Sequence, residues 1–120
     1  MNIIEKRFND IYEIIENRID SNESKNSFDK KFLEIQRDSE REFRIFINEE
    51  YYIRDIKIEM NENYEIIISE YDSEEYKKYI RIFSINMILY DNNKYHFKNL
   101  KRMIINMIND LLLFYDDIKI

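Results

Sequence analysis

The stretch that decides the fold is "YYIRDIKIEMNENYEIIISEY", residues 51–71. Apolar side chains alternate with polar ones on both sides of "NEN" (61–63), which is typical of paired β-strands that bury one face. A three-residue hairpin loop needs a left-handed residue at its end, and Asn63 tolerates that backbone better than most residues. We therefore predict a β-hairpin made of strands 51–60 and 64–71.

This loop sets the predicted register. On one face it pairs Met60 with Tyr64, Ile58 with Ile66, Ile56 with Ile68, and Arg54 with Glu70. That face is apolar and ends in an opposite-charge pair, so we expect it to face the core. On the other face the register pairs Glu59 with Glu65, Lys57 with Ile67, Asp55 with Ser69, and Ile53 with Tyr71. The like-charge pair of Glu59 and Glu65 costs stability, which indicates a face that folding alone does not explain.

The flanking segments extend the hairpin into a meander. Strands are predicted at 30–38, 41–48 and 77–90, with a turn at 91–93 and a short return strand at 94–97. The segment 30–38 could also form a helical turn, and we favour a strand because a hairpin-like partner follows it. In 41–48, Phe43, Ile45 and Ile47 share one face, while Arg44 and Phe46 occupy the other. We expect an antiparallel β-meander of about five strands.

Amphipathic helices are predicted at both ends of this meander. In 2–20 the apolar positions, spaced by three and four residues, are Ile4, Phe8, Ile11, Ile15 and Ile19. In 98–116 they are Leu100, Ile104, Met107, Leu111 and Phe114. A polar loop is expected at 21–27. The sequence predicts one α+β domain, residues 1–120, with an N-terminal helix, the meander and a C-terminal helix in two layers.

The composition lacks several common residues. Gly, Pro, Cys, Trp, Ala, Val and Thr are absent, which indicates a very AT-rich gene from a low-GC bacterium, its phage or a mobile element. Without Gly, we expect left-handed turn positions to fall on Asn or Asp. No disulfide can form, and no signal peptide or membrane-spanning segment is visible. We expect a cytoplasmic protein, in the host cell if the gene belongs to a phage.

The stretch 59–76 holds seven carboxylates and no Lys or Arg, against a formal net charge of −6 for the chain. The residues predicted to bind a partner are Glu59, Glu62, Glu65, Glu70, Asp72, Glu74 and Glu75, with Tyr64, Tyr71 and Tyr76 as aromatic anchors. One interpretation is a solvated strand edge whose charges prevent aggregation. The other is a surface that docks on a basic partner, since concentrated charge speeds such encounters.

Little in the sequence supports catalysis. Cys and Thr nucleophiles and Gly-rich phosphate loops are absent, and His96 is the single histidine. One pattern remains: Asp55 with Glu75-Tyr76-Lys77 resembles the carboxylates and lysine of metal-dependent nucleases, although so charged a chain produces such triplets by chance. We predict no catalytic residue, no metal site and no cofactor.

A basic segment, 94–102, carries Lys94, Lys98, Lys101 and Arg102 around His96. It is too small for sequence-specific nucleic-acid binding, and a pI near 4.9 argues against such binding in general. We therefore predict no direct contact with nucleic acid.

The working hypothesis is a small acidic inhibitor that covers a basic, nucleic-acid-binding surface of a nuclease or CRISPR effector. Phage anti-defence proteins such as anti-CRISPR inhibitors belong to this functional class, and the link to this chain is an analogy of size and charge. The alternative is an immunity protein that neutralises a basic nuclease toxin. A metal-dependent nuclease and a homo-oligomeric structural protein, such as a homodimer, remain further alternatives, and no membrane partner is expected.

Overall fold

The computed structural model describes residues 2–25, 33–48, 53–90 and 94–116. Its elements are, in order, α1 (Ile3–Lys25), β1 (Leu33–Ser39), β2 (Glu42–Asn48), β3 (Ile53–Met60), β4 (Glu65–Asp72), β5 (Lys78–Asn86), the 3₁₀ helix η2 (Met87–Tyr90) and α2 (Lys94–Asp116). The predicted α+β class, with a helix before and after the strands, is confirmed.

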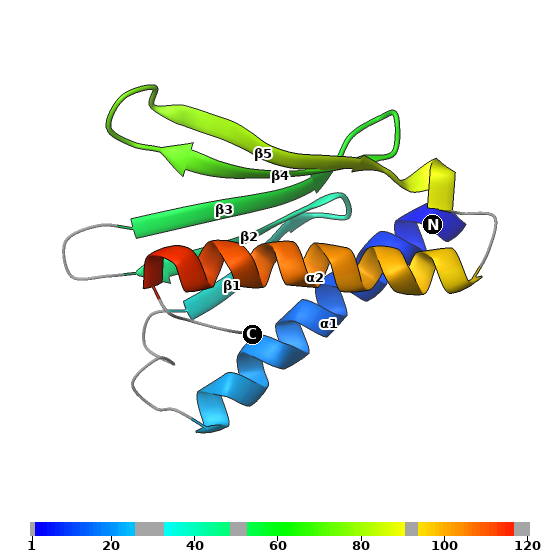
Figure 1. Ribbon diagram of the computed structural model, residues 1–120, viewed down its shortest axis with the longest axis horizontal. Coiled ribbons are helices and arrows are strands. Elements are labelled where there is room, and N and C mark those ends of the chain that lie inside the picture. Colours follow the sequence, from blue (N-terminus) through cyan, green and yellow to red (C-terminus); the bar gives the residue numbers. More distant parts are fainter. Residues whose placement is uncertain (1, 26–32, 49–52, 91–93, 117–120) are drawn as a thin grey trace.

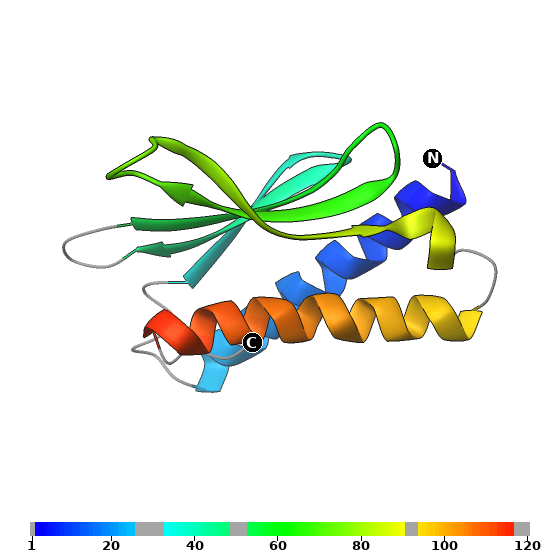
Figure 2. The ribbon, with the colours of Figure 1, turned by 45° about the horizontal axis from the view of Figure 1, so that its top comes forward.

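The five strands form one antiparallel sheet in the order β1-β2-β3-β4-β5, which confirms the predicted meander. Both helices lie against the same face of this sheet, so that the protein has two layers (Figures 1 and 2). The opposite face, called the outer face below, is left uncovered by helices. None of the described helices has a run long and apolar enough to cross a bilayer.

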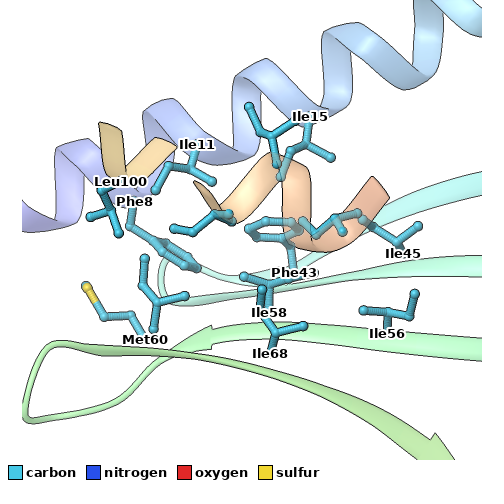
Figure 3. Close-up of a cluster of buried hydrophobic side chains, with 14 of the residues drawn as sticks. Phe8, Ile11, Ile15, Phe43, Ile45, Ile56, Ile58, Met60, Ile68 and Leu100 are labelled. Atoms are coloured by element: carbon cyan, nitrogen blue, oxygen red, sulfur yellow. The ribbon is translucent and has the colours of Figure 1, made fainter. Parts of the chain in front are cut away.

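The core lies between the helices and the sheet, and large side chains fill it (Figure 3). The Phe43 ring of β2 lies 5.6 Å from the Phe8 ring and 5.2 Å from the Tyr12 ring of α1, measured between centroids. The buried apolar positions of α1 are Phe8, Ile11, Ile15 and Ile19, as the spacing predicts. Because the chain has no Ala, Val or Gly, isoleucine and phenylalanine provide the contacts that small residues make elsewhere.

Helix α1 begins with a reciprocal cap and is longer than predicted. The Asn2 side chain accepts a hydrogen bond from the Glu5 amide at 2.8 Å, and the Asn2 amide donates to the Glu5 carboxylate at 3.4 Å. The helix continues to Lys25, so the predicted loop is wrong for residues 21–25, and residues 26–27 lie outside the described residues. Neither Gly nor Pro occurs after Asp20 to end the helix.

The segment 94–97, predicted as a return strand, is the first turn of α2. Phe97 is buried with Leu100 and Ile104, so the helical spacing of apolar residues begins earlier than the sequence suggested. β5 ends at Asn86 rather than at residue 90, because the Asn86 side chain accepts a hydrogen bond from the Ile88 amide at 2.9 Å and turns the chain into η2. The predicted turn at 91–93 lies outside the described residues.

Candidate functional site

The acidic stretch 59–76 begins at the end of β3, passes through the β3–β4 hairpin and along β4, and ends in the β4–β5 turn. Figure 1 shows these two hairpin turns at opposite ends of the sheet. β4 has eight residues and therefore spans about 25 Å at ~3.3 Å per residue. The carboxylates of this stretch thus form two groups rather than one continuous patch.

The β3–β4 hairpin has a three-residue loop, as predicted, but the loop lies one residue later in the chain. Asn61 closes it: its amide donates to the Glu65 carbonyl at 3.0 Å, and its carbonyl accepts from the Tyr64 amide at 3.0 Å. The loop residues are therefore 62–64, and the strand register is shifted by two: Ile56 lies opposite Glu70, Ile58 opposite Ile68, and Met60 opposite Ile66. Because the shift is even, every side chain keeps its predicted face.

The Asn61 side chain explains the position of this loop. Its oxygen accepts hydrogen bonds from the amides of Asn63 at 2.9 Å and Glu65 at 3.0 Å. Asn is favoured at the first position of such a turn because its side chain can satisfy backbone amides two residues ahead. Asn61 therefore precedes the loop instead of belonging to it.

The left-handed residue of the loop is Tyr64, with φ of 61°, and not Asn63. Tyrosine avoids this conformation in isolation, so surrounding contacts must hold it. The Tyr64 ring packs against the core, the Arg41 guanidinium lies 5.1 Å from its centroid, and its hydroxyl accepts from the Asn2 side chain at 3.3 Å. The expectation that left-handed positions fall on Asn or Asp is wrong for the described residues with positive φ, Tyr64 and Lys77.

The predicted pairing of Glu59 with Glu65 is also wrong. Glu59 lies opposite Ile67 on β4 and opposite Glu42 on β2. A like-charge pair is therefore present on the outer face, but its two carboxylates come from β2 and β3 and not, as predicted, from β3 and β4. The Lys57 ammonium lies 3.8 Å from the Glu42 carboxylate and 3.7 Å from the Glu59 carboxylate, so one lysine serves both.

The β1–β2 turn and the β3–β4 hairpin lie at the same end of the sheet (Figure 1), and together they gather carboxylates from separate parts of the sequence. We call this group the acidic end: Glu40, Glu42, Glu59, Glu62 and Glu65. Glu40 and Glu62 are exposed turn residues, and the Glu65 carboxylate accepts from the Asn61 side chain at 3.2 Å. Among the described residues, Lys57 is the cation that forms ion pairs with this group.

Arg41 links the two turns and forms an ion pair with Glu5 of α1. Its carbonyl accepts from the Met60 amide at 2.8 Å, and its guanidinium donates to the Asn61 carbonyl at 3.1 Å and to the Glu5 carboxylate at 2.7 Å. The hydrogen bond from Arg41 lowers the pKa of Glu5. This guanidinium is therefore directed to α1 and to backbone. Sequence reasoning missed Glu40 and Glu42 because only the β2–β3 register brings them beside Glu59.

Glu70 belongs to neither hairpin end. Its carboxylate accepts two hydrogen bonds from the buried Arg54 guanidinium, at 2.6 and 3.0 Å, on the face that packs against the helices. Arg54 also donates to the Leu111 carbonyl of α2 at 3.4 Å. The opposite-charge pair that the sequence predicted is present, although the two residues lie diagonal to each other. The Glu70 carboxylate is therefore bound to Arg54 of the same chain.

The second group of carboxylates lies at the β4–β5 turn. We call this region the β4–β5 tip: Asp72, Glu74, Glu75, Lys77 and Lys78. The Asp72 side chain accepts from the amides of Glu75 at 2.8 Å and Glu74 at 3.0 Å, and the Glu75 amide is the main cause of a lowered Asp72 pKa. Asp72 also lies opposite Lys78 in the β4–β5 register. Two lysines thus offset most of the charge at this tip.

The three tyrosines predicted as anchors lie in different surroundings. Tyr64 is half-buried at the acidic end, as described above. Tyr71, on the outer face of β4, is 39% exposed and meets the Tyr79 ring edge-on at 5.2 Å. Tyr76 in the β4–β5 turn is 57% exposed, with the Lys78 ammonium 5.8 Å from its ring centroid. The two exposed tyrosines therefore accompany the less acidic of the two regions.

A polar network that the sequence did not predict occupies the middle of the outer face. Arg44 contacts Asp38 at 2.7 Å and Asp55 at 3.3 Å, and the Tyr79 hydroxyl donates to Asp55 at 2.6 Å. Burial, together with the hydrogen bond to Asp55, raises the pKa of Tyr79 to about 12. The Lys57 ammonium lies 4.1 Å from the Tyr79 ring centroid, so this network adjoins the acidic end.

This network bears on the nuclease alternative. The Oδ2 atom of Asp55 contacts Arg44 and Tyr79, whereas Glu75 and Lys77 lie beyond the end of β4 in the exposed turn. Within the described residues, no three side chains of Asp, Glu or His gather in a way that could hold a metal ion. Asp55 thus lies on β3, whereas Glu75 and Lys77 come from the β4–β5 turn.

Comparison with protein-family models, with curated proteins and with solved structures found no match for this chain.

Proposed function

We propose that this protein binds a basic surface of another protein through its acidic end and prevents that surface from binding nucleic acid. The observation that carries the proposal is the pair Glu42 and Glu59, two carboxylates directly opposite each other and served by the single lysine Lys57. Glu40, Glu62 and Glu65 surround them. In the free protein the two carboxylates share Lys57, and a cationic partner would relieve the repulsion that one lysine leaves.

The electrostatic argument rests on what folding requires. Like charges opposite each other on adjacent strands destabilise a sheet, and an Asn, Thr or Lys at either position would avoid that cost. Exposed carboxylates close together attract a cationic surface over about 10 Å at 0.1 M salt and raise the rate of encounter. The strongly basic surfaces of cytoplasmic proteins are often those that bind nucleic acid, which favours a nuclease or CRISPR effector as the target.

The experiment compares two double variants of equal charge change. Glu40→Lys with Glu62→Lys alters exposed turns of the acidic end, and Glu74→Lys with Glu75→Lys alters the exposed turn of the β4–β5 tip. Each form is used as bait on host-cell extract, and the captured basic protein is then tested for nucleic-acid binding with and without the bait. We expect the acidic-end variant to lose capture and inhibition at least tenfold, while the tip variant keeps both.

Salt provides an independent measurement on the same complex. Because the contact is carried by exposed charges, its Kd should rise steadily between 50 and 300 mM salt, and the slope should be smaller for the acidic-end variant. Equal losses for the two variants, or a Kd that does not depend on salt, would contradict the proposal.

A further inference from the structure

We propose that Ile3 and Ile88 form an apolar anchor beside the acidic end, and that the occupant is a basic segment of a partner protein carrying apolar side chains among its cations. This inference rests on the proposed function and adds the chemistry of the partner. Carboxylates alone would accept any cation, including a polyamine or a lysine-rich disordered chain. An apolar anchor would select among them.

Two isoleucines outside the β4–β5 hairpin are exposed to solvent. Ile3 is 55% exposed at the start of α1, and Ile88 is 48% exposed in η2. The other large apolar side chains that are exposed among the described residues, Tyr71, Tyr76 and Ile82, all belong to the β4–β5 hairpin. The two isoleucines are thus separate from that group.

Each isoleucine follows a residue that is hydrogen-bonded to Tyr64, although 85 positions separate the two isoleucines in the sequence. The residue before Ile3, Asn2, donates to the Tyr64 hydroxyl at 3.3 Å. The residue before Ile88, Met87, donates through its amide to the Tyr64 carbonyl at 2.8 Å. Figures 1 and 2 show η2 beside the first turn of α1 in both orientations. Tyr64 belongs to the loop that carries Glu62, so apolar and acidic side chains share this end of the molecule.

The backbone at both positions is held before any partner arrives. The reciprocal cap between Asn2 and Glu5 fixes the start of α1, and the hydrogen bond from the Ile88 amide to Asn86 fixes η2. Asn86 lies opposite Glu65, which places Ile88 two residues from a position paired with the acidic end. Anchors on ordered backbone lose little conformational freedom on binding, so their burial contributes more to affinity.

Charge complementarity identifies the occupant. The carboxylates require cations opposite them, and the isoleucines require an apolar surface to cover them, as in protein interfaces with an apolar centre and a polar rim. A polyamine meets only the first requirement, and an uncharged apolar groove meets only the second. A protein segment with lysines or arginines placed around leucine-like side chains meets both.

Two synthetic peptides of equal length and equal lysine content test the inference. One places leucines between the lysines at helical spacing, and the other places serines at the same positions. Their Kd values for the full chain are measured by isothermal titration calorimetry at 100 mM salt, and amide chemical shifts locate the contact. We expect the leucine peptide to bind about tenfold more tightly, with the largest shifts at Ile3, Tyr64 and Ile88.

Matched variants distinguish binding at the anchor from nonspecific hydrophobic binding. Ile3→Ser and Ile88→Ser should each reduce the preference for the leucine peptide at least threefold, whereas Ile82→Ser, which changes an isoleucine 43% exposed on β5, should leave it unchanged. Equal affinity for both peptides, or a preference that survives both anchor variants, overturns the anchor and leaves the electrostatic proposal standing. If neither peptide binds, both the electrostatic proposal and the anchor are overturned.

Discussion

The acidic end and the β4–β5 tip share the carboxylates of the stretch 59–76, but the acidic end also includes Glu40 and Glu42, and the two regions are stabilised by different contacts. At the acidic end, the β2–β3 register adds Glu42 to Glu59, and Arg41 ties both turns to α1. At the β4–β5 tip, Asp72 caps its own turn, and two lysines lie within the same few residues. The comparison shows that surplus charge depends on which strands become neighbours, and much less on how densely acids occur in the chain.

The two regions also differ in how they hold a left-handed residue. Tyr64 keeps φ of 61° through contacts with the core, Arg41 and Asn2, whereas Lys77 adopts φ of 52° in an exposed turn. A composition without glycine forces ordinary residues into these positions. The cost of the left-handed backbone is offset by tertiary packing at Tyr64, whereas at the exposed Lys77 packing does not offset it.

The largest expected effect concerns Glu70, which the comparison assigns to neither region. Glu70→Ala would remove the two hydrogen bonds that the Glu70 carboxylate accepts from the buried Arg54 guanidinium, and we expect the free energy of unfolding to fall by about 2–3 kcal/mol, since Glu70 is partly exposed. Urea unfolding followed by circular dichroism measures it. Glu74→Ala at the β4–β5 tip is the control and should leave the midpoint unchanged. A negligible effect of Glu70→Ala would mean that Glu70 is available to a partner after all.

A second prediction makes the same substitution at both left-handed positions. Tyr64→Gly removes a ring that packs against the core and should lower the free energy of unfolding by about 2 kcal/mol, despite the relief of backbone strain. Lys77→Gly relieves strain without loss of packing and should raise it by about 0.5 kcal/mol. Thermal and urea unfolding of the two variants give the signs. Two changes of the same sign would show that the regions do not differ in this respect.

A third prediction concerns the outer face beside the acidic end. The pKa of Tyr79 is about 12 in the folded protein against 10.0 for a free tyrosine, so the folded state binds more protons between these values. Its stabilising contribution is therefore complete below pH 10 and is lost as the pH rises from 10 to 12. We expect this loss to be about 1 kcal/mol after allowance for partial exposure.

The measurement compares urea midpoints at pH 9 and pH 11.5. Tyr79→Phe should decline less over this interval than the wild type, while Tyr71→Phe should follow the wild type. Tyr12, whose pKa is also raised to about 12 by its hydrogen bond to Glu16, contributes equally to all three forms and cancels in the comparison. An identical decline in Tyr79→Phe would show that the hydroxyl does not titrate in this range.

The smallest effect on stability is expected for Glu59→Gln, although we expect this variant to weaken partner binding clearly. Glu59→Gln removes both the repulsion from Glu42 and the attraction of Lys57, so the free energy of unfolding should change by less than about 0.5 kcal/mol. Binding of the leucine–lysine peptide should weaken several-fold in the same variant. A large loss of stability with unchanged binding would make Glu59 a structural residue and remove it from the acidic end as a functional group.

The spacing of apolar residues along the chain was enough to predict the two layers of this protein and the face on which each side chain lies. Alternation in 51–71 identified the paired strands, and spacings of three and four identified the helices, because these periods reflect the repeat of each local structure. Even the opposite-charge pair of Arg54 and Glu70 could be predicted, since a register error of two residues leaves every side chain on its own face.

The grouping of the carboxylates, in contrast, follows from contacts that form when the chain folds. Asn61 shifted the loop by using its side chain as a cap, Tyr64 entered a conformation that its packing sustains, and β2 brought Glu42 beside Glu59. The spacing of apolar residues predicts none of these features. Some depend on contacts between residues far apart in the chain, and others depend on which of several neighbouring residues begins the turn. Charge along the chain is a local property, whereas the surface a partner meets is set by the order and register of the strands.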